Sequence, residues 1–175
     1  MRSCVIPLVI LVTLAAGCDR DESVHAYQAP KESAPAVADS APWKIPSGWE
    51  RETDQPMRVA SFRAGDAEVI IAKFGAESFA SLLPNINRWR NQAGLEPVDD
   101  PKDVKAEDGA VGRFKAKIYD FTGPSKRLRV AVVLNGPDVW YFKIQGSADG
   151  VASQLPAFEE FLRSVKLESS DPQPQ

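Results

Sequence analysis

The sequence predicts an α+β fold with a mainly antiparallel sheet of about five to six strands and two or more packed helices. Three observations carry this prediction. Several segments alternate polar and apolar residues, as half-buried strands do, and short turns rich in Gly and Pro separate them. Two other segments repeat apolar residues every three to four positions, as amphipathic helices do. The elements follow the order strand pair, helix, three-strand meander and closing helix.

The strands are placed by alternation and by the turns between them. A hairpin is expected where Ala64-Gly65-Asp66 joins two alternating segments, and a meander where Gly123-Pro124 and the NGPD segment join three more. The strand that begins at Arg127 is apolar at nearly every later position, so both faces of the sheet should be covered there. The expected strands are Arg58–Arg63, Glu68–Phe74, Arg113–Phe121, Arg127–Leu134 and Val139–Gln145.

Two helices complete the expected fold. The first follows Pro84, buries Ile86, Trp89 and Ala93, and ends at Gly94. The second runs from about residue 150 to residue 164 and places Leu155, Phe158 and Leu162 on one face. Pro156 lacks an N–H and crowds the preceding turn, so we expect a kink or a restart there. The acidic segment between the first helix and the meander, EPVDDPKDVKAEDGA, is expected to be a connection.

The N-terminus has the layout of an export signal. Arg2 precedes the apolar run VIPLVILVTL, which is shorter than the roughly 20 residues of a membrane-spanning helix, and small residues follow it. The ending LAAGC resembles the lipobox of bacterial lipoproteins, which implies that Cys18 is lipidated, with fatty acyl groups such as palmitate. Asp19 resembles a signal for retention in the inner membrane. The alternative is an ordinary cleaved signal with an incidental free thiol.

These observations divide the chain into four parts. Residues 1–17 are the expected signal peptide, and residues 18–42 are the acylated cysteine with a disordered tether rich in Ala, Pro and Ser. Beyond the cysteine the tether has 24 residues and would span roughly 27 Å as a flexible coil. Residues 43–167 are the folded domain, and residues 168–175 are an expected disordered tail. The protein is therefore expected in the cell envelope, lipid-anchored to a bacterial membrane, on its periplasmic or outer face.

The folded domain resembles the PsbP-like α/β/α sandwich. The resemblance rests on the opening Gly48-Trp49, on the order of elements, on the meander ending WYFKIQGS and on the closing FEEFLRSV. The segment NINRWRNQAGL also resembles one in uncharacterised bacterial lipoproteins of this general shape. Members of the PsbP-like group mostly bind or stabilise larger partners. The resemblance therefore implies a binding or accessory domain, and it carries over no catalytic residue.

Composition argues against most enzymes. The formal charge is −3 and the pI is about 5.3, which gives no reason to expect nucleic acid. The only histidine, His25, and both cysteines, Cys4 and Cys18, precede the folded domain, which thus lacks the usual general base, zinc ligands and thiol nucleophile. We therefore expect no enzymatic activity, no cofactor and no metal. A Ser–Lys site and a hydrolase site with paired carboxylates are the remaining enzymatic alternatives, although no spacing in the sequence points to either.

The candidate partner-binding segment lies on the first helix. Its residues are Asn87, Arg88, Trp89, Arg90 and Asn91, with the two asparagines expected on one exposed ridge. One interpretation is a polar recognition surface around an aromatic, whose partner is a protein of the membrane or envelope. The other is a helix anchored by a core tryptophan, with its arginines paired to nearby acids. A second function hypothesis is a domain that binds a small molecule or glycan beside the sheet.

Three further groups each have a functional and a structural interpretation. The first is a basic strand face that could meet anionic lipid or act as a solvated rim. The second is an acidic loop that could bind Ca²⁺ or be solvated. The third is a pair of tryptophans that could stack on sugars or seal a sheet edge. Their members are Lys115, Lys117, Arg127, Arg129 and Lys143; Asp99, Asp100, Asp103, Glu107 and Asp108; and Trp43 and Trp49.

Overall fold

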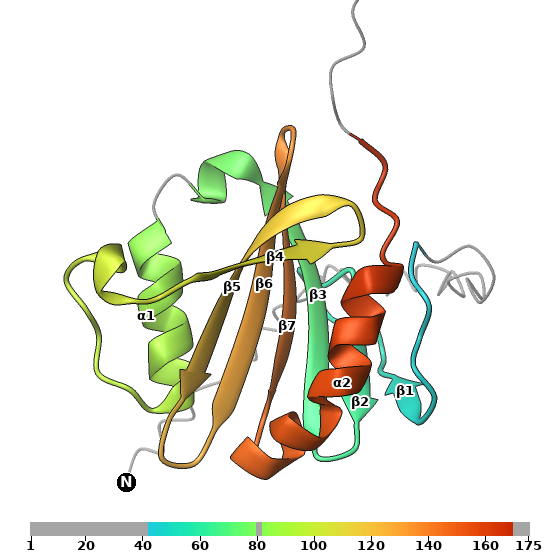
Figure 1. Cartoon of the computed structure of the whole chain (residues 1–175), viewed down its shortest axis with the longest axis horizontal. Helices are drawn as coiled ribbons and strands as arrows, with labels where there is room; N and C mark the ends of the chain where they lie inside the picture. Colours follow the sequence, from blue (N-terminus) through green and yellow to red (C-terminus); the bar gives the residue numbers. More distant parts are fainter. Residues whose placement is uncertain (1–41, 80–81, 170–175) are drawn as a thin grey trace, which may run out of the picture. The chain divides into compact units, whose positions relative to one another are not determined.

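The computed structural model describes residues 42–79 and 82–169, which form an α+β domain around one antiparallel sheet (Figure 1). The predicted fold class is confirmed. The sheet order is β1-β2-β3-β7-β6-β5-β4. The strands are β1 (Trp49–Arg51), β2 (Ala60–Ala64), β3 (Ala67–Gly75), β4 (Glu107–Val111), β5 (Phe114–Thr122), β6 (Arg127–Asn135) and β7 (Asp138–Gly146). The helices are α1 (Leu82–Ala93) and α2 (Ala148–Ser164), with short 3-10 turns at Ala76–Phe79 and Pro101–Asp103.

The strand count of five to six was too low, because the described part of the sheet has seven strands. β1 has three residues, too few to show alternation. β4 lies in the segment expected to be an acidic connection, and its sequence EDGAV looks like a loop. It is nevertheless a strand, because a tight turn at Gly112 (φ 54°) folds it back onto β5. Pairing with a neighbour, rather than its own composition, makes this segment extended.

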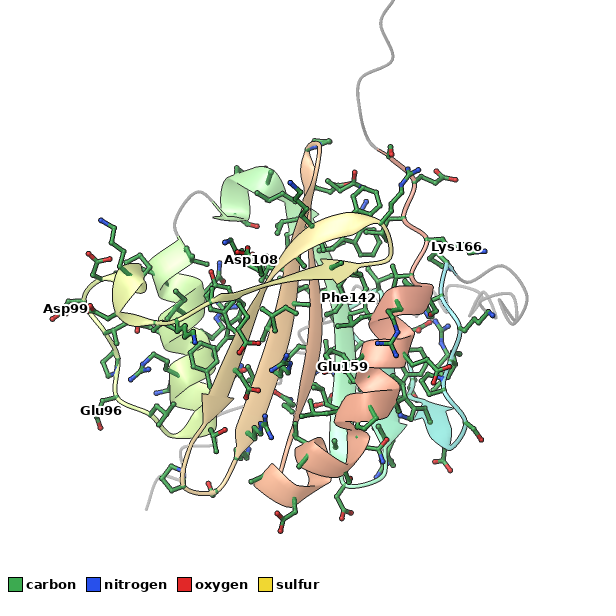
Figure 2. The ribbon with its side chains drawn as sticks, viewed as in Figure 1. Glu96, Asp99, Asp108, Phe142, Glu159 and Lys166 are labelled. Carbon is green, nitrogen blue, oxygen red and sulfur yellow. The ribbon has the colours of Figure 1, made fainter. Side chains whose placement is uncertain are left out.

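Alternation along the strands separates the two faces of the sheet. On one face, the side chains of Phe62, Ile71, Phe142 and Ile144 form a core with α2, and Figure 2 shows Phe142 between the sheet and that helix. Phe161 of α2 stands at the centre of this core. It is fully buried and makes ring contacts with five other aromatic residues: Trp43, Trp49, Phe62, Phe142 and Phe158.

α2 is one helix with Pro156 in its interior, so the predicted restart does not occur. Proline removes one hydrogen bond from the helix ladder. Apolar residues on both sides of Pro156 nevertheless pack against the sheet, Val151 before it and Phe158 and Leu162 after it. Their burial holds the two halves on the same face of the sheet. Neither described helix is long and apolar enough to cross a membrane.

α1 packs on the opposite face, over β5 and β6. Ile86, Trp89 and Ala93 are buried there, as predicted. The turn between β5 and β6 holds the end of this helix closely, because a β-carbon at Gly123 would overlap the carbonyl oxygen of Ala93. Since α1 lies toward the β5 side, part of β3 and β7 remains beside it without a helix above. This uncovered strip forms one wall of the candidate site.

The predicted basic strand face is divided between the two sides of the sheet. Arg129 and its neighbour Arg127 point to the α2 side, whereas Lys143 points to the α1 side, because Lys143 is opposite Val130 in the register. Both arginines donate to the Asp120 carboxylate, at 2.7 Å from Arg127 Nη2 and 2.8 Å from Arg129 Nη1. Burial opposes ionisation of Asp120, but the hydrogen bonds from the two arginines outweigh it and lower its pKa. These arginines are thus structural partners of Asp120.

Candidate functional site

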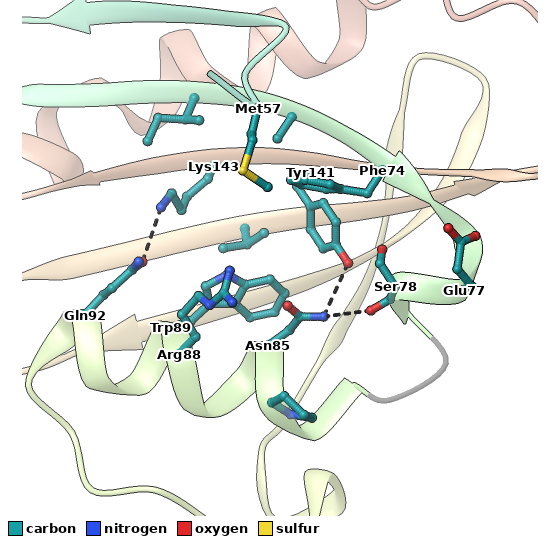
Figure 3. Close-up of a pocket in the computed structure, with 14 residues that line it drawn as sticks. Met57, Phe74, Glu77, Ser78, Asn85, Arg88, Trp89, Gln92, Tyr141 and Lys143 are labelled. Carbon is teal, nitrogen blue, oxygen red and sulfur yellow. Dashed lines mark hydrogen bonds between the residues drawn. The ribbon is translucent and has the colours of Figure 1, made fainter. Parts of the chain in front are cut away.

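A pocket of about 550 Å³ lies between α1 and the uncovered strip of β3 and β7 (Figure 3). Even-numbered residues of β3 and odd-numbered residues of β7 face it, because alternation puts them on the α1 side of the sheet. Trp89 contributes its ring from the helix and packs at 5.9 Å from the ring of Tyr141. The floor is therefore apolar and partly aromatic, and its members are Ile70, Ala72, Phe74, Trp89, Val130 and Tyr141.

Polar side chains surround this floor. Three of them come from α1, one comes from β7, and two come from the turn after β3. Met57 closes the mouth on the β2 side with a side chain that is 75% exposed, on a residue in the left-handed backbone region (φ 65°). The polar members are Glu77, Ser78, Asn85, Arg88, Gln92 and Lys143. An apolar floor with a few convergent polar groups is the usual form of a small-molecule site.

Lys143 is the most unusual of these groups. It is half-buried on β7, and its ammonium donates to Gln92 Oε1 at 3.2 Å. Within the described residues it forms no ion pair, because both oxygens of the nearby Glu68 carboxylate are bonded to Arg58 and Gln145. Burial is the main cause that lowers the pKa of Lys143 to about 8, and Arg58 and Arg88 add to this effect against the attraction of Glu68.

The opposite end of the pocket has a neutral polar group. Asn85 Nδ2 donates to the carbonyl oxygen of Ser78 at 3.4 Å and lies 3.5 Å from the Tyr141 hydroxyl. Glu77 lies beside Ser78 at this end, away from Lys143 (Figure 3). Burial raises the pKa of Tyr141, so this hydroxyl stays neutral at pH 7. The pocket is therefore positively charged at the Lys143 end and neutral or acidic at the Ser78 end.

Comparisons with known proteins give similarity in shape only. No family model matches the chain, and no curated protein matches it in sequence. A crystal structure from Bacteroides thetaiotaomicron is similar with a TM-score of 0.47 and 12% identity, over 73% of this chain but only 45% of the other. The cyanobacterial PsbP (CyanoP) of Synechocystis is similar with a TM-score of 0.45 and 11% identity, over 70% of this chain and 84% of the other.

LpqN of Mycobacterium tuberculosis, which is involved in cell envelope biogenesis, is similar with a TM-score of 0.42 and 13% identity, over 69% of this chain and 78% of that protein. Similar solved structures thus include a PsbP protein. Likeness of this degree carries no argument about family, partner or activity.

The structure divides the predicted partner-binding segment into three parts. Trp89 is a core residue that also forms pocket floor. Asn87 does not lie on an exposed ridge, because its amide donates to the Val98 carbonyl and accepts from the Val98 N–H, both at 2.9 Å. Arg90 Nε similarly donates to the Glu96 carbonyl at 2.6 Å. These two side chains hold the loop after α1, so they have structural tasks.

Arg88 and Asn91 are the exposed members of the segment, and Arg88 alone of the two lines the pocket. Arg88 makes no ion pair among the described residues. Cys18, the predicted lipidation site, lies outside those residues, and its lipidation stays a prediction.

The other candidate groups have structural partners. Trp43 and Trp49 are both buried in the α2-side core, and Trp49 Nε1 donates to Gln154 Oε1 at 3.0 Å. In the acidic loop, Asp100 caps the 3-10 turn through the Lys102 N–H, and Asp108 pairs with Lys117 at 2.7 Å. No group of three or more Asp, Glu, His or Cys side chains in the described ranges is placed to hold a metal ion.

The sequence grouped Lys143 with Arg127 and Arg129, which lie on the other face of the sheet. The candidate residues chosen from the sequence did not include Asn85, Gln92 or Met57. One signal was present. In VWYFKIQ, Lys143 continues the series Val139 and Tyr141, which face α1. A lysine in such a position lies either beyond the edge of the helix that covers this face of the sheet, or inside a pocket beside that helix. Only the position of α1 distinguishes the two.

Proposed function

We propose that this protein is a lipid-anchored, non-enzymatic domain of the bacterial envelope that binds a small molecule in the pocket between α1 and the sheet. The observation that carries the proposal is the pocket itself: about 550 Å³, with an apolar floor and a rim of convergent polar groups. The lipobox-like LAAGC supports the envelope location. The folded part of the sequence, residues 43–167, contains no histidine and no cysteine, which supports a binding role.

The pocket can be closed by one substitution. Ala72 is half-buried in its floor, so Ala72→Trp would place an indole where a ligand would lie. With the full chain in phosphatidylcholine nanodiscs, we expect octan-1-ol to raise the midpoint of thermal unfolding by about 3–6 °C at ten times its dissociation constant. We expect no such shift for Ala72→Trp.

Ala152→Trp is the matched control, because it adds the same indole at an exposed position of α2, on the other side of the sheet. It should respond to octan-1-ol as the unsubstituted protein does. An equal shift in Ala72→Trp, or none in any of the three proteins, would contradict a ligand site in this pocket.

Docking of an envelope protein is the second candidate, and the exposed Arg88 and Asn91 on α1 favour it. Crosslinking in intact cells followed by purification should yield one stoichiometric protein companion, and Arg88→Ala with Asn91→Ala should reduce its recovery several-fold. Arg90 is unsuited to this test, because its loss would release the loop held through Glu96. Recovery of lipid or wall material alone would leave the pocket as the functional site.

A further inference from the structure

Building on the proposed pocket function, we infer that the ligand is an anionic amphiphile whose single carboxylate or phosphate group lies between the Lys143 ammonium and the Arg88 guanidinium. The apolar part of such a ligand would cover the floor formed by Ile70, Ala72 and Tyr141. The inference concerns the class of ligand and the two residues that select it.

The first support is an uncompensated pair of cations. Lys143 and Arg88 both line the pocket, and they are close enough for the charge of Arg88 to affect the titration of Lys143. Neither forms an ion pair among the described residues, although eight such contacts occur elsewhere in the described domain. Two adjacent cations that form no ion pair attract an anion that can hydrogen-bond to both.

The second support is that the carboxylate nearest in effect to Lys143, that of Glu68, already has hydrogen-bond partners. Glu68 is the carboxylate that attracts Lys143 most, but Arg58 and Gln145 hold its two oxygens. Lys143 is instead directed to the neutral Oε1 of Gln92, as Figure 3 shows. A ligand anion would replace this weak partner without displacing the ion pair of Glu68.

The third support is the asymmetry of the pocket. The two cations lie toward one end, whereas Glu77 lies at the other, beside Ser78 (Figure 3). Between them the floor is apolar, with the half-buried Ala72, Phe74 and Tyr141. A ligand with one anionic end and an apolar body fits this arrangement, whereas a cationic amphiphile would place its charge against Lys143 and Arg88.

The test compares probes that share one alkyl chain. Using the full chain in phosphatidylcholine nanodiscs, with empty nanodiscs subtracted, titration calorimetry would measure octanoate, octyl phosphate, octan-1-ol and octylammonium. We expect the two anions to bind at least tenfold more tightly than the alcohol, and octylammonium to bind more weakly than the alcohol. A preference between octanoate and octyl phosphate would identify a carboxylate or a phosphate headgroup.

Substitutions assign the preference to residues. Lys143→Met and Arg88→Met should each raise the dissociation constant of the anions about tenfold and leave that of octan-1-ol nearly unchanged. Lys115→Met is the matched control, because Lys115 is exposed on β5 outside the pocket and should have no effect. Equal binding of alcohol and anions, or unchanged anion binding in both variants, would overturn the inference while leaving the pocket function intact. Failure of all four probes would overturn both.

The pH dependence provides an independent readout. The groups facing Lys143 are Glu68 from β3, Arg58 from the segment before β2, and Arg88 from α1, and its pKa is about 8. The dissociation constant of octanoate should therefore rise above pH 8 as Lys143 loses its proton, and it should level off at about tenfold, the same loss as in Lys143→Met. In Lys143→Met it should stay flat across this range. A flat profile in the unsubstituted protein would overturn the role of Lys143.

Discussion

Phe161→Ala is expected to lower the free energy of unfolding by about 3–5 kcal/mol, the usual cost of removing a fully buried phenylalanine. Phe161 is 0% exposed. Its ring lies 5.4 Å from that of Trp49 and 6.0 Å from that of Trp43. The cavity would open where α2, the segment before β1 and the sheet meet, so three parts of the core would lose contacts together. Collapse of the surroundings would recover little, because the neighbours are large rings on separate elements.

Urea unfolding of the full chain, followed by tryptophan fluorescence, would measure this change. Such a loss is a large part of the total stability of a domain of this size, about 5–15 kcal/mol. Leu134→Ala is the control, because Leu134 is 55% exposed and should cost no more than about 0.5 kcal/mol. A loss below about 1.5 kcal/mol for Phe161→Ala would show that this ring is not the centre of the α2-side core.

Lys143→Met is expected to have the opposite effect on stability, raising the free energy of unfolding at pH 7 by about 1–3 kcal/mol. Burial, the main cause, lowers the pKa of Lys143 from its ordinary 10.5 to about 8. The charged lysine is therefore less favourable in the folded chain than in the unfolded chain. Methionine keeps most of the apolar length without the charge. Solvent that reaches the half-buried side chain keeps the gain at the lower part of this range.

The sign of the pH dependence follows from proton binding. Between about pH 8 and pH 10.5 the unfolded chain binds the Lys143 proton and the folded chain does not, so this residue makes stability rise with pH in that window. Lys143→Met should remove this rise, whereas Lys115→Met should keep it. Urea midpoints at pH 7, 8, 9 and 10 would measure it. A variant less stable than the unsubstituted protein at pH 7 would contradict an uncompensated charge at this site.

A residue that weakens the fold at neutral pH yet faces a pocket is typical of binding sites, where stability is given up for function. The combination of greater stability and weaker anion binding in Lys143→Met would therefore distinguish a ligand-binding lysine from one that only packs. Phe161, in contrast, lies in the α2-side core, and its loss should affect stability without a preference between anionic and neutral probes.

The sequence alone determined the fold class and most of the elements. Alternation in Arg127–Leu134 and Val139–Gln145 is a local property, set by which residues can face a core, and β6 and β7 follow it. The spacing of Ile86, Trp89 and Ala93 likewise determined the buried face of α1. The predicted lipobox at Cys18 is also a local signal, which needs no tertiary structure.

Only the tertiary structure decided what pairing and packing control. β4 is extended because Gly112 turns it onto β5, although its sequence favours a loop. The lateral position of α1 over β5 and β6 is not encoded in the pattern of any one element, yet it leaves the strip of β3 and β7 open. Because of this position, Arg88 lines the pocket, whereas Asn87 and Arg90 hold the loop after α1. The same position brings Arg88 close to Lys143, which lies 55 positions further along the chain. A binding site made by two elements depends on their distance and angle, which are set by the packing of all the side chains between them.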